Sequence, residues 1–357
     1  MKEGWEYKKL EEICSKGSSN ISLNKIEDNV GDYNLYGASG FVKGIDFYHQ
    51  DKAYIGIVKD GSGVGRVDIY PPKSSLVGTM QYIFPKEDCE IGFLKYLLQG
   101  LHLESFKTGA AIPHIYFKDY GKTKVPFPPL SEQLHIVEEL DLLSSIIEKK
   151  KVQLNELDNL AQSLFYEMFG DPITNDKGWE IKKIGEIASF FNGKAHENAI
   201  DDEGKYIVVN AKYISSNGEI IKNTNVQLSP LYTNDIVMVM SDVPNGKALA
   251  RCSLIKSDNL YSLNQRICAF RDYKQNPIYL LFVLNRNSYY LRFDDGNGQT
   301  NLRKNEVINC PVPLPPISLQ HQFASKIEAI EHQKELIKQS IKEVETLFNS
   351  RMDYYFN

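Results

Sequence analysis

The sequence predicts an α+β protein with two pseudo-symmetric mixed α/β domains, each followed by a long helix, the two helices packing as an antiparallel coiled coil. The first observation behind this is a tandem duplication: GWEYKKLEEICS, from Gly4, returns as GWEIKKIGEIAS from Gly178, and VPFPPLSEQ, from Val125, returns as VPLPPISLQ from Val312. The second is a heptad pattern of apolar residues after each proline-rich segment. The third is a series of short strand-like runs with glycine- and asparagine-rich turns between each opening motif and its helix.

The first long helix is expected to begin after the prolines at 128 and 129, with Ser131 as its N-cap. Gln133 and Lys150 interrupt an otherwise apolar seam, and Gly170 provides the stop signal. A helix of about 38 residues is about 57 Å long, and so narrow an apolar stripe needs a partner helix. The predicted seam consists of Ile136, Leu140, Leu143, Ile147, Leu154, Leu157, Ala161, Leu164 and Met168.

The partner helix lies in the same chain, at an offset of 187 residues. The ends of the two helices also correspond, because LDNLAQSLFYEMF from Leu157 aligns with VETLFNSRMDYYF from Val344. We therefore expect the two seams to pack against each other. The second seam consists of Gln320, Phe323, Ile327, Ile330, Ile337, Ile341, Val344, Phe348 and Tyr355.

The two offsets define the domain organisation. The opening motifs are 174 residues apart and the helices 187 apart, so the second globular segment is about 13 residues longer, and we expect the extra residues in surface loops. Trp5 and Trp179, at matching positions, are expected to anchor the cores. The predicted segments are a first domain at 1–128, a central helix at 129–170, a second domain at 171–315 and a C-terminal helix at 316–357.

Within each domain the pattern predicts three clear strands and one helix. LVGTMQ, from Leu76, aligns with LYSLNQ, from Leu260, but the middles of the two copies otherwise diverge. Matching frames with different loops suit two modules that act on different ligands. The expected strands are 53–58, 66–70 and 80–84 in the first copy and 206–210, 236–240 and 266–270 in the second; the expected helices are 92–101 and 278–291.

Composition narrows the class of protein. An apolar share of 42% and a charged share of 24% are typical of a soluble domain. No apolar run reaches the roughly 18 residues of a membrane span. Five scattered cysteines without a CxxC pair favour a reducing cytoplasm over a disulfide scaffold or a zinc site.

The net charge of −5 argues against simple electrostatic binding to nucleic acid. The segment 131–170 holds 3 basic and 8 acidic residues, so its net charge of −5 equals that of the whole chain. The globular segments are nearly neutral mixtures. Without a polybasic stripe, binding driven by counterion release is not expected. Recognition by shape and by base edges stays open.

The glycine-rich run KDGSGVGR, from Lys59, has three interpretations. A nucleotide-binding loop is disfavoured, because the run lacks the Walker spacing and a strand pattern follows it. The other two are a tight turn between strands, and a turn whose Lys59, Ser62 and Arg66 approach a DNA groove. The second copy has SDVPNGKALAR at this place, with Asn245 and Lys247 as the corresponding candidates.

A second pair of loops precedes each proline-rich strand. FKTGAAIPHI, from Phe106, corresponds to FDDGNGQTNL, from Phe293, again at an offset of 187. Amide side chains bond adenine and arginine bonds guanine, so these loops supply candidates for base contacts. The alternative is ordinary turn chemistry. The candidates are Lys107, Thr108 and His114 in the first copy and Gln299, Asn301 and Arg303 in the second.

The sequence does not match the common catalytic motifs. HENAI, from His196, lacks the second histidine of a zinc-binding HExxH helix, and no Gly-x-Ser-x-Gly elbow is present. The proline pairs lack the flanking residues of an amino-methyltransferase signature. These mismatches favour a recognition or scaffold protein over an enzyme.

The ordered set of motifs resembles the specificity subunit of type I restriction-modification systems. The resemblance covers essentially the whole chain and is carried by VPFPPLSEQ, VPLPPISLQ and SLFYEMFGDP (from Ser163). It implies two target-recognition domains, each reading one half of a bipartite target in double-stranded DNA. It also implies two modification subunits that hold S-adenosylmethionine and methylate adenine, restriction subunits in a full nuclease, and no cofactor in this chain.

On this interpretation the helices hold the two domains at a set separation, which suits half-sites about 34–36 Å apart. Their acidic outer surface is either a docking surface for the partner subunits or an ordinary solvated helix face. Two alternatives stay open: a stand-alone S-adenosylmethionine-dependent DNA methyltransferase with an unrecognised site, and an interaction scaffold that reads no DNA. The target sequence and the spacer length do not follow from these residues.

Overall fold

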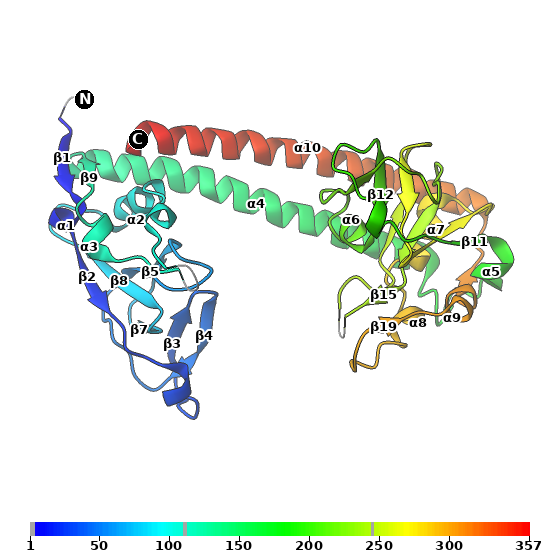
Figure 1. Ribbon diagram of the computed structural model, residues 1–357, viewed down its shortest axis with the longest axis horizontal. Helices are drawn as coiled ribbons and strands as arrows, with labels where there is room; N and C mark the ends of the chain where they lie inside the picture. Colours follow the sequence, from blue (N-terminus) through cyan, green and yellow to red (C-terminus); the bar gives the residue numbers. More distant parts are fainter. Residues whose placement is uncertain (1–3, 110–112, 244–245) are drawn as a thin grey trace. The chain divides into compact units, whose positions relative to one another are not determined.

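The computed structural model describes residues 4–109, 113–243 and 246–357 and contains two compact units (Figure 1). One unit consists of residues 1–152 together with 337–357, and the other of residues 153–336. Each unit therefore takes part of both long helices. The four consecutive segments predicted from the sequence describe the order of the chain rather than its packing, and their boundaries stay a prediction.

The first unit combines a mainly β domain with parts of both long helices. Its elements are β1 (Glu6–Lys9), α1 (Leu10–Ile13), β2 (Cys14–Ser18), η1 (Leu23–Lys25), β3 (Tyr33–Gly37), β4 (Gly40–Ile45), β5 (Tyr54–Val58), β6 (Val67–Tyr70), β7 (Ser74–Leu76), β8 (Met80–Pro85), α2 (Ile91–Gly100), η2 (Leu103–Phe106), α3 (Phe117–Tyr120), β9 (Lys124–Phe127) and the start of α4 (Leu130–Phe169).

The second unit repeats this order with additional elements. They are β10 (Ile181–Lys183), α5 (Ile184–Ile187), β11 (Ser189–Asn192), η3 (Glu197–Ala199), β12 (Tyr206–Val209), α6 (Ala211–Ser215), β13 (Asn223–Thr224), β14 (Ile236–Val239), β15 (Ser241–Asp242), β16 (Cys252–Leu254), β17 (Tyr261–Leu263), β18 (Ile267–Arg271), α7 (Pro277–Leu284), α8 (Ser288–Leu291), β19 (Thr300–Asn301), α9 (Lys304–Ile308), β20 (Pro311–Pro313) and the start of α10 (Ile317–Phe356).

The sheets of the two units have the same topology. The four-stranded sheet has the order β2-β8-β5-β6 in the first unit and β11-β18-β14-β16 in the second. The three-stranded sheet has the order β4-β3-β7 in the first and β13-β12-β17 in the second, each with one parallel pair. The predicted duplication is therefore a duplication of the fold, and the predicted strands all form with ends shifted by one residue at most.

Strand register corrects one part of the sequence alignment. Leu76 pairs with Tyr36 in the first unit, and Leu263 pairs with Val209 in the second. Leu76 therefore corresponds to Leu263, an offset of 187, and the alignment of LVGTMQ with LYSLNQ was three residues out of register. Pattern matching failed here because a three-residue strand carries too little periodicity to fix its own register.

The two long helices run antiparallel in each unit. In the first unit Glu139 bonds Arg351 and Lys151 lies near Glu345. Residue numbers therefore increase along α4 where they decrease along α10. In the second, Lys334 Nζ lies 2.7 Å from Asp158 Oδ1. All predicted seam residues are buried or half-buried, which confirms the predicted antiparallel packing. The predicted N-cap was wrong: α4 begins at Leu130, and the carbonyl of Pro129 accepts the first helical hydrogen bonds.

Gln133, expected only to interrupt the seam, is fully buried and bonds the end of a loop. Its Oε1 accepts from the backbone N–H of Glu90 at 2.8 Å, and its Nε2 donates to the carbonyls of Asp88 and Pro128, both at 2.9 Å. Gln320 repeats this, because its Oε1 accepts from Asn276 N–H at 2.9 Å. Glu90 and Asn276 are the N-caps of α2 and α7, so each glutamine ties a long helix to the start of its own domain's helix.

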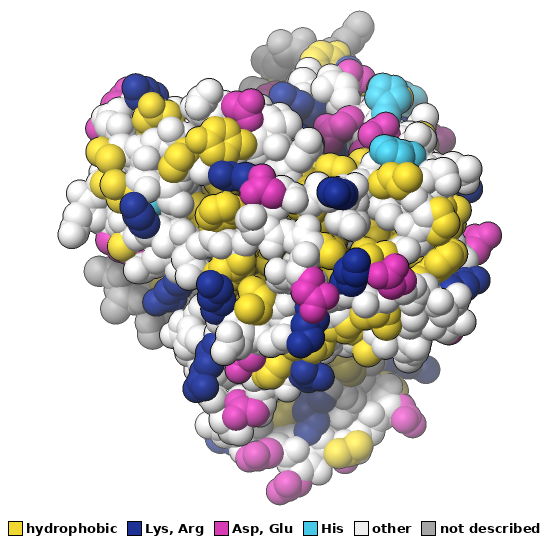
Figure 2. Space-filling model, turned by 90° about the vertical axis from the view of Figure 1, so that its right-hand side faces the viewer, with side chains coloured by type: hydrophobic (Ala, Val, Ile, Leu, Met, Phe, Trp, Pro, Cys, Tyr) yellow, Lys and Arg dark blue, Asp and Glu magenta, His cyan; other side chains and the backbone are white. Residues whose placement is uncertain are grey.

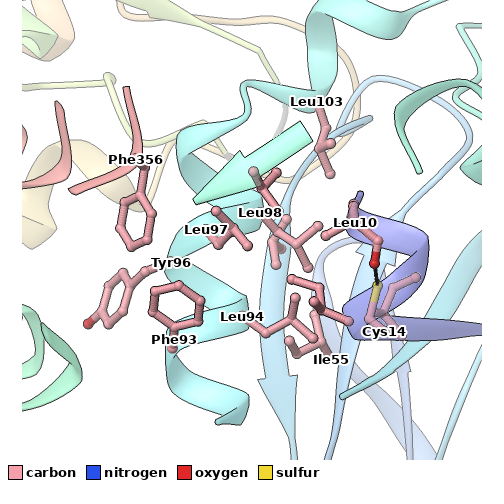
Figure 3. Packing of buried hydrophobic residues seen from close by; sticks show 14 of the residues in the cluster. Leu10, Cys14, Ile55, Phe93, Leu94, Tyr96, Leu97, Leu98, Leu103 and Phe356 are labelled. Atoms are coloured by element: carbon pink, nitrogen blue, oxygen red, sulfur yellow. Dashed lines mark hydrogen bonds between the residues drawn. The ribbon is translucent and has the colours of Figure 1, made fainter. Parts of the chain in front are cut away.

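Each core also includes the end of the helix that comes from the other repeat. In the first unit the ring of Phe356, from α10, lies 5.6 Å from that of Phe93 in α2 (Figure 3). In the second, Phe169, from α4, lies 4.7 Å from Tyr279 in α7. Phe169 and Phe356 are 187 residues apart, so each repeat contributes the equivalent aromatic residue to the core of the other repeat's domain.

Two local expectations need correction. The helix predicted over 278–291 is two helices, α7 and α8, because the chain turns at Arg286, whose φ is +52°. The tryptophans are half-buried rather than central. Trp5 packs against the edge of its core, and the indole N–H of Trp179 donates to the carbonyl of Phe169 at 2.9 Å.

His196 is a structural histidine. It is fully buried, its Nδ1 lies 2.7 Å from the carbonyl oxygen of Lys194, and its Nε2 lies 2.8 Å from the hydroxyl of Ser262. Among the residues described, no three His, Cys, Asp or Glu side chains gather as a metal site would require. No helix in the same part of the chain combines the length and the apolar character needed to cross a bilayer.

Candidate nucleic-acid interface

The first unit brings its two predicted loops side by side. The glycine-rich run connects β5 to β6, as expected of a turn between strands, and its base is closed where Gly65 N–H donates to the carbonyl of Val58. The N–H of Ile115 donates to the carbonyl of Lys59 and the N–H of Gly61 to that of Pro113, both at 3.0 Å. Two loops about 50 residues apart in the chain thus meet at one surface, and we call this contact the loop junction of the first unit.

The second unit builds the same junction from different residues. The N–H of Leu302 donates to the carbonyl of Met240 at 2.8 Å, and the strands β15 and β19 pair Ser241 with Asn301. This pair corresponds to the single bridge between Asp60 and His114 in the first unit. The equivalence of His114 with Asn301, predicted from the offset of 187, is confirmed by this register.

In the first unit the side chain of Asp60 closes the junction. His114 Nδ1 lies 2.7 Å from Asp60 Oδ1, and Lys59 Nζ lies 3.9 Å from Asp60 Oδ2. Asp60 therefore interacts with two of the predicted DNA-binding side chains, His114 and Lys59. Around the junction, exposed candidates surround these partly engaged ones: Ser62, Arg66, Lys107 and Thr108.

In the second unit an amide and a hydroxyl take the place of the first unit's aspartate and histidine. The amide of Gln299 donates to Ser241 Oγ at 2.6 Å. Arg303 precedes α9, where its backbone N–H donates to the carboxylate of Glu306 at 2.6 Å, and its side chain is exposed. Lys247 and Asn301 are also exposed, while Asn245 lies outside the described residues.

Sequence reasoning missed two residues that hold the longer loop of the second unit. Asp242 Oδ2 accepts from the backbone N–H groups of Ala248 at 2.6 Å and Leu249 at 3.1 Å. Arg286 donates to the carbonyl of Leu249 at 3.3 Å. Aspartate side chains often accept backbone hydrogen bonds from the loop that follows them, but nothing in the sequence ties Arg286 to Leu249, 37 residues earlier.

A groove of about 550 Å³ lies beside the first unit's junction, against β6 and the turn between β3 and β4. Arg66, a predicted DNA-binding residue, lines it together with acidic, aromatic and imidazole side chains. Burial raises the pKa of Tyr70, and the nearby carboxylate of Asp68 raises it further. Gln99, His102 and Glu104 also line the groove.

The surface charge is mixed. One face of the molecule carries lysine and arginine side chains interspersed with acidic and hydrophobic ones (Figure 2). The globular segments are likewise near-neutral in composition, with basic and acidic residues in nearly equal numbers. If this surface binds nucleic acid, short-range contacts to base edges therefore have to provide the sequence selectivity.

Two domains of one topology, each presenting a loop junction of its own side chains, define a two-module recognition protein. The family model for the type I restriction modification DNA specificity domain matches residues 2–159 and again residues 176–346. The chain belongs to this family, with one copy of the domain in each repeat. It is a DNA specificity protein of the type I restriction-modification class.

Individual relatives agree with this assignment. The chain is 22% identical over 316 residues to the specificity subunit of the type I restriction enzyme MjaVIII from Methanocaldococcus jannaschii, covering 80% of this chain and 74% of that protein. Its fold is similar to the S subunit of a type I restriction-modification system from M. genitalium, with a TM-score of 0.59, 15% identity and coverage of 99% and 96%. A chain from a study of complex assembly and conformational transition in the type I system has a TM-score of 0.59, 16% identity and coverage of 98% and 97%.

Proposed function

We propose that each loop junction reads one half of a bipartite target in double-stranded DNA. The observation that carries this is the shared backbone frame: Ile115 bonds Lys59 in the first unit as Leu302 bonds Met240 in the second, while the surrounding side chains differ. A constant frame with different exposed side chains suits two readers of different base sequences. Arg303 and Asn301 are proposed for base edges, and Lys59, Arg66 and Lys107 for phosphates or bases.

The long helices are proposed to set the distance between the half-sites and to dock two modification subunits. Each helix is 40 residues long without a break, which corresponds to about 60 Å, and each contributes to both units. Exposed apolar side chains on them, such as Leu130, Leu142 and Leu347, support a docking role. Restriction subunits would join the same assembly in a full nuclease.

The chain itself is proposed to be non-catalytic and to bind no cofactor, with S-adenosylmethionine held by the modification subunits. The support is that the junctions consist of loop backbone and surface polar groups held mainly by one another, without a nucleophile-and-base arrangement among those described. The five unpaired cysteines support placing the assembly in a reducing cytoplasm.

An exchange of residues 1–125 for the equivalent domain of another family member tests this function. The exchanged chain, assembled with its modification subunit and S-adenosylmethionine, should methylate adenine at a motif with one half changed and the other half retained. Mapping of methylated adenines measures the outcome. An unchanged motif would favour the scaffold alternative, and methylation by the isolated chain, or tight calorimetric binding of S-adenosylmethionine to it, would favour the methyltransferase alternative.

At single-residue resolution, Arg303→Ala should relax one base position within the half-site read by the second domain. Loss of a base contact should reduce discrimination there by about 1–3 kcal/mol, or roughly 5- to 150-fold. Lys274→Ala, an exposed cation on another loop, is the matched control and should leave the motif unchanged. A uniform loss of binding to all sequences would instead assign Arg303 to phosphate contact.

A further inference from the structure

The edge of the three-stranded sheet carries an exposed apolar pair in both units. Lys43 of β4 pairs with Leu35, and Lys222, just before β13, bonds Val208, the residue equivalent to Leu35. Phe41–Val42 and Ile220–Ile221 are therefore the two residues that directly precede these equivalent lysines. The exposed fractions are 62% for Phe41, 39% for Val42, 52% for Ile220 and 49% for Ile221. We call the two pairs the first and second edge pairs.

A matching acidic segment covers the rest of each edge. In the first unit the segment 26–31 lies on β4, since Lys43 Nζ donates to the carbonyls of Ile26 at 3.0 Å and Glu27 at 2.8 Å. In the second, the N–H of Asp201 donates to the carbonyl of Asn223 at 3.0 Å. A Cβ on Gly31 or on Gly204 would overlap the backbone of the facing strand, so both segments approach equally closely.

These segments are acidic in both units. The first carries Glu27 and Asp28 and is followed by Asp32, and the second carries Asp201, Asp202 and Glu203; all five of the side chains at 27, 28, 201, 202 and 203 are exposed. Carboxylates repel a phosphate backbone, so the surface is a poor match for DNA. It complements a protein surface with apolar and basic side chains.

We infer that each edge pair, with its acidic segment, docks one copy of the same protein partner, which presents an apolar patch rimmed by lysine or arginine. The reading junctions differ between the units, whereas the edges keep the same chemistry at equivalent positions. A surface repeated in this way fits a partner that binds twice. This inference rests on the proposed function, which supplies such a partner in the two modification subunits.

In the first unit the docked partner would lie close to the reading junction. Residues 38–40, which precede the first edge pair, line the groove that also contains Arg66. The ring of Phe41 lies 6.4 Å from that of Tyr36, which in turn lies 4.8 Å from Tyr70 in the same groove. Binding at the edge therefore places the partner beside the DNA-reading loops without using their side chains.

The test compares Phe41→Ser/Val42→Ser, Ile220→Ser/Ile221→Ser and the combination of all four, in the full chain. Sedimentation and calorimetry with purified modification subunit should show that each double variant weakens one of two binding events about tenfold, and that the combination weakens both. Asp28→Lys and Asp202→Lys should each weaken the same event as the edge pair of their unit. Ile173→Ser, at an exposed residue between α4 and β10, is the control and should bind like the parent chain.

Three results separate the possibilities. Unchanged binding by the edge variants, with two copies bound to the parent chain, would overturn this inference alone. A changed methylation motif with unchanged subunit binding would assign the edges to DNA and overturn it as well. A parent chain that binds no modification subunit would overturn the proposed function first. Circular dichroism and a Phe41→Leu variant, expected to bind normally, separate loss of contact from loss of folding.

Discussion

At one equivalent position in the four-stranded sheets, the first unit has two aromatic residues and the second has an ion pair. Tyr54 and Phe84 lie one residue beyond the strand pair Ile55–Ile83, and Asp235 and Arg271 lie one residue beyond the pair Ile236–Phe270. In the first unit the site is aromatic: the hydroxyl of Tyr54 bonds that of Ser74 at 2.7 Å, and both rings pack on Tyr82.

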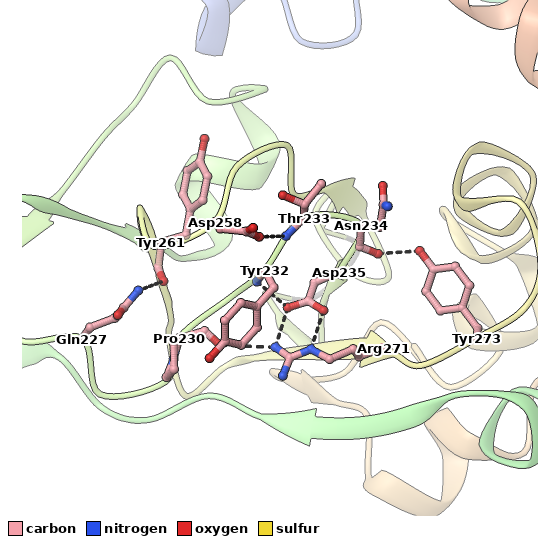
Figure 4. Close-up of polar contacts among 10 residues, drawn as sticks. All are labelled: Gln227, Pro230, Tyr232, Thr233, Asn234, Asp235, Asp258, Tyr261, Arg271 and Tyr273. Atoms are coloured by element: carbon pink, nitrogen blue, oxygen red, sulfur yellow. Dashed lines mark hydrogen bonds and ion pairs between the residues drawn. The ribbon is translucent and has the colours of Figure 1, made fainter.

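In the second unit the site is an ion pair (Figure 4). Arg271 donates to both carboxylate oxygens of Asp235, at 2.7 and 2.6 Å, and its guanidinium lies over the ring of Tyr232. The hydrogen bonds to Asp235 raise the pKa of Arg271. The backbone frame accepts either filling, so the duplicated fold depends on strand pairing and helix packing rather than on particular core residues.

The largest expected effect comes from breaking that ion pair. Asp235→Ala should lower the free energy of unfolding by about 3–5 kcal/mol, because Asp235 is fully buried and its loss leaves Arg271 without its carboxylate. Tyr54→Phe, at the equivalent place in the first unit, should cost only about 1 kcal/mol for one hydroxyl bond. Urea denaturation measures both.

Replacing the pair together sharpens the comparison. Asp235→Leu with Arg271→Met should recover most of the stability lost in Asp235→Ala, since a buried ion pair is often replaced by apolar residues at little cost. Equal small losses for Asp235→Ala and Tyr54→Phe would mean that the ion pair is already solvated and that the two sites are energetically alike.

The next effect concerns the two glutamines that tie each long helix to its domain. Gln133→Ala removes three hydrogen bonds from a fully buried site and should cost about 3 kcal/mol. Gln320→Ala removes bonds to Asn276 and Pro315 and should cost about 2 kcal/mol. Denaturant unfolding tests the order, with Leu134→Ala, at an exposed neighbour, expected to cost under about 0.5 kcal/mol.

The smallest effect is a pH dependence confined to the first unit's helix pair. The hydrogen bond from Arg351 holds the pKa of Glu139 below its usual value, and Tyr355 donates to the same carboxylate. The stabilisation is therefore complete well above the unfolded pKa of about 4.3 and is lost as pH falls through the lower folded value.

Glu139→Gln should accordingly lower the free energy of unfolding by about 1 kcal/mol at pH 7, because the pair is partly exposed, and by almost nothing near pH 3. Urea unfolding at the two pH values checks this. The corresponding position in the second repeat is Lys326, so Lys326→Gln is a control without this pH dependence. An equal loss at both pH values would show that Glu139 acts through packing rather than charge.

Much of the fold could be predicted because its signals repeat. Heptad spacing predicted both helices, and the offset of 187 placed His114 on Asn301, as the strand register does. Local chemistry was less reliable: Ser131 is not the N-cap, and the helix over 278–291 breaks at Arg286. These details depend on which backbone group a distant segment offers, and periodicity carries no such information.

The candidate loops were found by sequence, but their association was not. Nothing local to KDGSGVGR indicates that it bonds the loop around His114, or that Asp242 and Arg286 hold the longer loop of the second unit. The repeated edge pairs were also missed, because Phe41–Val42 and Ile220–Ile221 share exposure and a place before an equivalent lysine rather than identity.

The sequence by itself determined that the chain is duplicated, that each copy ends in a long heptad helix, and which family it belongs to. These features are periodic or recur at a constant offset, so they can be read along one dimension. Only the tertiary structure decided which loops meet, which side chains are already engaged, and that each core takes an aromatic residue from the other repeat's helix. Those outcomes depend on contacts between residues far apart in the chain, and such contacts are settled by packing.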